Sequence, residues 1–145
     1  MLPFKKLSAQ ENQALLKFPA YISMLAAQLD YKLDETEKKS AIKFSHTKTF
    51  SCNPLLTEFY EEVDKVFKKN IEQLDDDLPK DKELREVVIK NELMILEKMV
   101  LKLGKDYSLE MHRSMKSFKQ HVSKAHHNVL VDFIFPLSIP GLNEN

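Results

Sequence analysis

The stretch Phe18-Pro-Ala-Tyr-Ile-Ser-Met-Leu-Ala-Ala-Gln-Leu29 is followed directly by Asp30-Tyr-Lys-Leu-Asp-Glu-Thr-Glu37. The first half is apolar around most of a helical circumference, which predicts a helix in the centre of a domain. The second half contains a capping-box pattern, because Asp34 stands three residues before Glu37. The junction therefore predicts a buried helix that ends near Asp30 and another helix that begins near Asp34.

Cap signals and apolar periodicity predict further helices on both sides of this junction. Ser8 and Glu11 form another capping box, and Pro19 is expected to end or kink the helix that starts there. Asp81 can cap a helix that Gly104 closes. Counting these signals together, we expect helices over roughly 8–18, 19–29, 34–49, 54–78, 81–103 and 107–135.

The predicted fold is all-α, a single compact bundle of about six helices formed by residues 1–145 as one domain. Residues 136–145 are expected to form a non-helical C-terminal tail, because Pro136 stops the last helix. The chain has only two glycines. Dinucleotide fingerprints and Walker phosphate loops need more, since backbone must approach phosphate closely. These two large classes of nucleotide-binding enzyme are therefore not expected.

The sequence favours a soluble, cytoplasmic protein. Its single cysteine, Cys52, cannot form an internal disulfide, and we expect an inert thiol. The start of the chain lacks the apolar core of a signal peptide. Of the two apolar runs, 18–29 is too short to span a bilayer and 129–142 is interrupted by Asp132 and Pro136. With a formal net charge of zero, no general attraction to nucleic acid is expected.

The acidic segment after the apolar run is a candidate site for a divalent cation, the one cofactor that we consider. Asp30, Asp34 and Glu37 are the candidate ligands, since carboxylate oxygens suit hard cations. The segment is not an EF-hand, because Lys32 occupies the third position of the loop. The alternative is purely structural, with Asp30 ending one helix and the other two acids capping the next.

The same region resembles the tellurite-resistance TerB family. The resemblance rests on Leu16-Lys-Phe-Pro19, Asp30, Leu33, Asp34 and Glu37, about thirty residues near the N-terminus. It implies a TerB-like, all-helical domain that takes part in a stress response and binds a metal through these acids. Tyr31 stands where the family usually has glycine.

No arrangement of residues typical of a catalytic site is found, and no catalytic residue is predicted. The sequence contains no Glu-x-x-His, His-x-x-x-His or Cys-x-x-Cys spacing. A di-iron bundle or a zinc-helix protease would need one of these patterns. We therefore expect a non-enzymatic protein, with a protein as its partner, and rank an unrecognised enzyme last.

The last long helix has a basic face opposite its apolar stripe. Four residues of this face are candidates for binding an anionic partner such as an acidic protein, RNA or DNA: Arg113, Lys116, Lys119 and Lys124. His112 is expected on the same face. The alternative is that the face is simply solvated, and no aromatic platform for stacking bases accompanies it.

Overall fold

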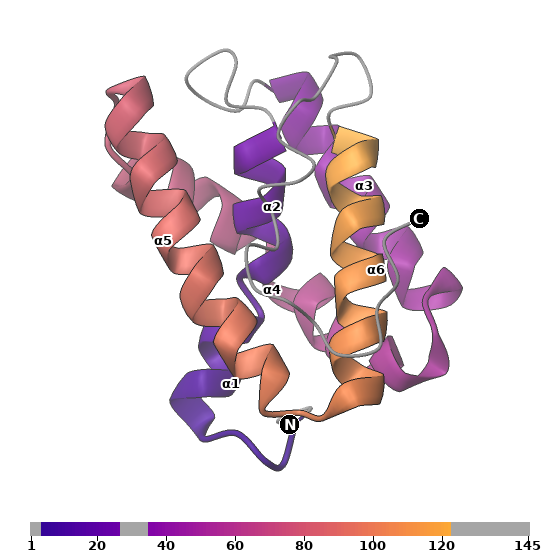
Figure 1. The fold of residues 1–145 in the computed structure, drawn as a ribbon. Coiled ribbons are helices and arrows are strands. Elements are labelled where there is room, and N and C mark those ends of the chain that lie inside the picture. The colour runs from indigo at the N-terminus through magenta and orange to yellow at the C-terminus, as the bar shows by residue number, and fades with distance from the viewer. Residues whose placement is uncertain (1–3, 27–34, 123–145) are drawn as a thin grey trace.

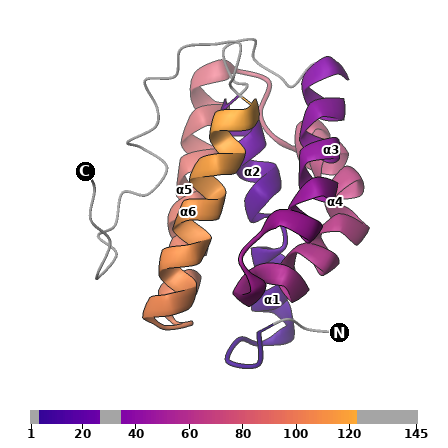
Figure 2. The same ribbon diagram turned by 90° about the vertical axis from the view of Figure 1, so that its right-hand side faces the viewer.

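The apolar run Phe18–Ala26 forms α2, the central helix of the fold, as predicted. The computed structural model describes residues 4–26 and 35–122, and every side chain from Phe18 to Leu25 is buried. α2 packs against α4, α5 and α6. Figure 2 shows α2 between α5 and α6 on one side and α3 and α4 on the other. The described residues form helices and no strand, in the order α1 Ala9–Leu15, α2 Phe18–Ala26, α3 Glu35–Ser51, the 3₁₀ turn η2 Pro54–Leu56, α4 Thr57–Asp77, α5 Lys82–Leu101 and α6 Lys105–Val122.

The start of α1 has the capping box that the sequence predicts. The Ser8 hydroxyl accepts a hydrogen bond from the Glu11 amide at 3.0 Å, and the Ser8 amide donates to the Glu11 carboxylate at 2.9 Å. The boundary between α1 and α2 differs from the prediction. The break lies at residues 16–17, and Pro19 sits in the first turn of α2. Proline suits that position because a first-turn amide needs no helical acceptor.

Three further predicted boundaries can be compared with the structure. Asp81 caps α5 by accepting a hydrogen bond from the Leu84 amide at 3.0 Å. Gly104 follows α5 with φ at +98°, a conformation that glycine adopts without a steric penalty. Asn53 caps a 3₁₀ turn, with α4 starting only after it. The expected capping box at Asp34 and the expected end of the last helix lie outside the described residues.

Asn12 fixes the segment before α1 to the bundle. Its side chain is fully buried and exchanges two hydrogen bonds with the backbone of Phe4, at 3.0 and 2.9 Å. It also donates to the carbonyls of Leu7 and Ser8. Phe4 itself is buried, and its ring contacts the rings of Phe59 on α4 and Tyr107 on α6. One amide side chain therefore positions an aromatic that joins two helices.

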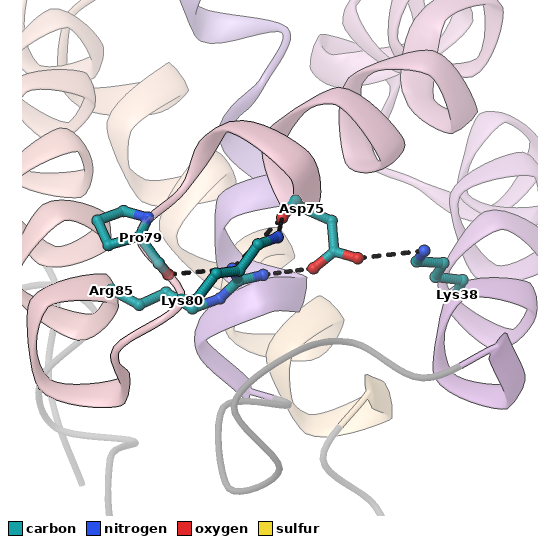
Figure 3. A network of polar contacts seen from close by, with 5 residues as sticks. All are labelled: Lys38, Asp75, Pro79, Lys80 and Arg85. Atoms are coloured by element: carbon teal, nitrogen blue, oxygen red, sulfur yellow. Dashed lines mark hydrogen bonds and ion pairs between the residues drawn. The ribbon is translucent and has the colours of Figure 1, made fainter.

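A buried ion pair holds the turn between α4 and α5. Arg85, in the first turn of α5, is only 1% exposed, and its guanidinium pairs with the carboxylate of Asp75 in the last turn of α4. The second carboxylate oxygen of Asp75 lies 3.2 Å from Nζ of Lys38 on α3. Figure 3 shows Asp75 between these two cations. Three helices thus meet at one carboxylate.

The same group of residues also satisfies backbone carbonyls at the end of α4. The last four carbonyls of a helix have no partner within it. The carbonyl of Asp75 accepts hydrogen bonds from Lys80 Nζ at 2.9 Å and from the Arg85 guanidinium at 3.4 Å. The guanidinium also donates to the carbonyl of Pro79 at 3.4 Å. Burial of Arg85 is therefore matched by both a charge partner and backbone acceptors (Figure 3).

Candidate functional site

The proposed cation ligands are largely outside the part of the chain that the structure describes. Asp30 and Asp34 lie in the segment between α2 and α3, and only the backbone of Glu37 is described, in the first turns of α3. Within residues 4–26 and 35–122, no group of three or more His, Cys, Asp or Glu residues is arranged to hold a metal ion. The cation site at these acids stays a prediction.

The four predicted basic residues of the last helix are not all described. Arg113 is exposed, and its guanidinium forms an ion pair with Glu110 one turn earlier at 3.2 Å. Lys116 is partly buried. Lys119 lies within α6, although only its backbone is described, and Lys124 lies beyond the described residues.

The expected position of His112 is wrong. Its side chain is buried rather than part of the basic face, together with those of Met111 and Met115. The reason is that α6 is covered by more than one neighbour, since it contacts α2, α3 and α5. A helix packed on several sides buries a wider arc than a single apolar stripe indicates.

A small pocket of about 130 Å³ lies where the end of α3, the turn η2 and the first half of α6 meet. It brings Arg113 of the predicted basic face together with a lysine from another helix, Lys48. Its lining consists of Lys48, Ser51, Cys52, Asn53, Leu56, Glu110, Arg113 and Ser114. We call this the α3–α6 pocket.

Local sequence signals shape the rim of the α3–α6 pocket. α3 ends at Ser51, and the side chain of Asn53 accepts a hydrogen bond from the Leu55 amide at 2.9 Å, which starts η2. Leu56 at the end of η2 is buried and anchors this turn in the core. The backbone between α3 and α4 is thus held at both ends.

A hydrogen bond between buried hydroxyls joins α4 to α6 beside the pocket. The Tyr60 hydroxyl lies 2.5 Å from the Ser114 hydroxyl, and both residues are buried. Burial raises the pKa of Tyr60, so its phenol stays protonated across the physiological range. This contact fixes the position of Ser114, and with it the turn of α6 that carries Arg113.

The charges of the α3–α6 pocket comprise two cations and one carboxylate. Burial lowers the pKa of Lys48, whose Nζ also lies 5.5 Å from the centre of the Phe44 ring. An anion beside this partly desolvated ammonium would stabilise its charged form. Arg113 is held by Glu110, so a bound anion would compete with Glu110 for the guanidinium. The pocket as a whole has an excess of one positive charge.

Cys52 lines the same pocket, with its thiol 3.9 Å from the Thr57 hydroxyl. Along the chain, the histidine nearest to Cys52 is His46, which could activate the thiol as a base if the two side chains met. The His46 ring instead lies 2.9 Å from the carboxylate of Asp64 on α4 and is largely exposed. The described lining of the pocket contains no histidine. No activated nucleophile is formed by these described residues.

No family model, curated protein or solved structure matches this chain. The resemblance to the TerB family therefore rests on the N-terminal residues alone. Over the described residues, none of the helices has the combined length and apolar character needed to cross a bilayer.

Most of the α3–α6 pocket was not anticipated from the sequence. Of its eight lining residues, Arg113 alone was singled out as a binding residue. Lys48 lies on α3, which has no clear amphipathic pattern, and nothing in its local sequence indicates a neighbour on α6. The signal that could have drawn attention to the region is the helix break at Cys52-Asn53-Pro54, because such a break exposes side chains at a junction.

Proposed function

We propose that this chain is a non-enzymatic helical binding module that takes an anionic group of a partner, a phosphate or a carboxylate, in the α3–α6 pocket. One observation carries the proposal. Lys48 and Arg113, from different helices, line one pocket together with Ser51 and Asn53. Two cations with a neighbouring amide donor are a common way of holding an oxyanion, and the Ser51 hydroxyl at this pocket donates to the Thr47 carbonyl at 3.2 Å.

The geometry favours a small anionic group over an extended nucleic acid. A nucleic acid needs a basic surface several phosphates long. Here the cation of Arg113 is shared with Glu110, and the pocket is small. The expected ligand is therefore a single charged group at the end or edge of a partner, such as an acidic side chain or a phosphorylated residue.

Titration calorimetry with inorganic phosphate and with acetate tests this function. We expect weak binding of at least one of these anions, because a single group gains little beyond the cost of immobilising it. Lys48→Gln and Arg113→Gln should each weaken binding about five- to thirtyfold, since a lost charged hydrogen bond costs about 1–2 kcal/mol. Glu110→Gln should strengthen binding, because it frees the guanidinium.

Matched controls come from the same helices. Lys43→Gln on α3 and Lys105→Gln on α6 remove exposed lysines that do not line the pocket, so they should leave the affinity unchanged. Absence of binding heat with both anions would contradict the proposal. Equal losses in the control variants would also contradict it, because they would show only a general response to charge.

A divalent cation at Asp30, Asp34 and Glu37 is a second proposal, supported by the acidic spacing and the TerB resemblance. It would place the chain among stress-response proteins whose partner binding depends on a metal. Calorimetric titration with calcium, magnesium, manganese and zinc should give binding by at least one ion, abolished by Asp30→Asn with Asp34→Asn. If none of the four ions gave binding heat or changed the melting temperature, the cation proposal would be contradicted.

A further inference from the structure

The outward face of α5 carries four exposed apolar side chains between Leu84 and Ile95. Four of the five exposed large apolar side chains among the described residues lie on this one helix. Figure 1 shows α5 along the flank of the bundle, away from α3. Scattered apolar residues on a surface are ordinary, but a continuous apolar stripe marks a contact surface. The residues are Leu84 at 58% exposure, Val87 at 53%, Met94 at 36% and Ile95 at 49%.

The spacing of this stripe is that of a helix-pairing seam. The exposed positions Leu84, Val87, Asn91, Met94 and Lys98 follow each other at intervals of three, four, three and four residues. This is the a and d pattern by which two helices pack side by side. An amide in the middle of such a seam sets the register of the pair, and Asn91 occupies that place.

Charges at the two ends of α5 are complementary to a reversed copy of the same helix. Within α5, the exposed charged residues are Glu83 at its start and Lys98 near its end. In an antiparallel pair, each acidic end lies beside the basic end of the other helix. A parallel pair would place like charges together, and it would also align the helix dipoles unfavourably.

From these observations we propose that α5 pairs in antiparallel fashion with α5 of a second copy of this chain. A two-fold axis passes near Asn91, so that the two Asn91 amides face each other. Val87 of each copy then packs against Met94 and Ile95 of the other. The seam covers about two heptads of one helix, which gives a small interface and therefore a weak, concentration-dependent dimer.

Sedimentation equilibrium of the full chain, from low to high micromolar concentration, tests this pairing. The wild type should pass from monomer to dimer over that range. Val87→Glu should lower the association constant at least about tenfold, because a buried interface would receive an unpaired charge. Leu55→Glu is the matched control, since Leu55 is an exposed apolar residue on η2 rather than α5, and it should leave the association unchanged.

A charge exchange tests the antiparallel register. Glu83→Lys alone and Lys98→Glu alone should each weaken the dimer about two- to fivefold, because exposed ion pairs are modest. The double variant should restore wild-type association. A wild type that stays monomeric throughout would overturn the proposal, and would leave the stripe for another protein or another part of this chain. A dimer unaffected by Val87→Glu, or not restored by the double exchange, would also overturn it.

Discussion

Asp75→Asn is expected to lower the free energy of unfolding by about 3–5 kcal/mol, the range found when one partner of a buried ion pair is removed. The substitution keeps the shape of the side chain but removes its charge. Arg85 is then left 1% exposed without this counter-charge, and among the described residues it keeps its two 3.4 Å contacts to backbone carbonyls and the neutral amide that replaces the carboxylate. Urea denaturation followed by circular dichroism measures the loss.

Two further variants separate the ion pair from its surroundings. The double variant Asp75→Leu with Arg85→Met replaces both charges by apolar side chains, and it should be less destabilised than Asp75→Asn. Lys38→Met should have a smaller effect, because Lys38 is more exposed than Arg85 and Asp75 would keep its main partner. If Asp75→Asn changed the stability by less than about 0.5 kcal/mol, as surface substitutions do, the ion pair would not hold this turn.

Asn12→Leu is expected to cost about 2–4 kcal/mol, because it leaves buried backbone groups of the preceding segment without hydrogen bonds. The Phe4 amide loses its acceptor, and the Phe4 carbonyl keeps the Leu7 amide, at 3.3 Å, as its donor. The carbonyls of Leu7 and Ser8 each lose one donor. The Phe4 ring would then be less firmly held between Phe59 and Tyr107.

Denaturation and amide hydrogen exchange together check the Asn12 prediction. The Phe4 amide should exchange much faster in the variant, since its acceptor is the Asn12 side chain. Gln13→Leu is the control, because Gln13 is the exposed neighbour on the same helix. A stability loss equal in the two variants, with no change in exchange at Phe4, would show that Asn12 does not anchor the segment.

Local patterns were sufficient to predict that the described residues are all-helical. Ser8 and Asp81 cap helices as expected, Gly104 takes the left-handed conformation after α5, and the apolar run of α2 is buried at the centre. These features depend on neighbours within a few residues. The interactions that stabilise them therefore involve residues close together in the sequence.

The polar interior could not be predicted in the same way. Arg85 and Asp75 look like ordinary surface residues of charged helices, and their burial depends on how the turn between α4 and α5 folds back. The predicted position of His112 is wrong because the number of helices that pack against α6 cannot be read from its sequence. On α5, the apolar residues Leu84 and Ile95 are exposed, whereas Ile89 and Leu93 of the same helix are buried. Such features depend on tertiary contacts, which a periodic pattern does not encode.

The same reason explains the limited prediction of the α3–α6 pocket. The sequence pointed to a basic face on one helix, whereas the pocket combines Arg113 on α6 with Lys48 on α3. These residues are far apart along the chain, and their meeting depends on the packing of α3 against α6. A search along one helix could find one of the two cations and not the pair.

The central claim is that an anion binds in the α3–α6 pocket, and the thiol of Cys52 reports on it directly. Cys52 is the single cysteine of the chain and lines the pocket, partly exposed. The rate of its alkylation by iodoacetamide should therefore be measured with increasing phosphate or acetate, against sodium chloride at equal ionic strength. We predict that a bound anion slows alkylation several-fold in the wild type by covering the thiol, and that Arg113→Gln removes this protection. Alkylation at the same rate with and without either anion would contradict the account.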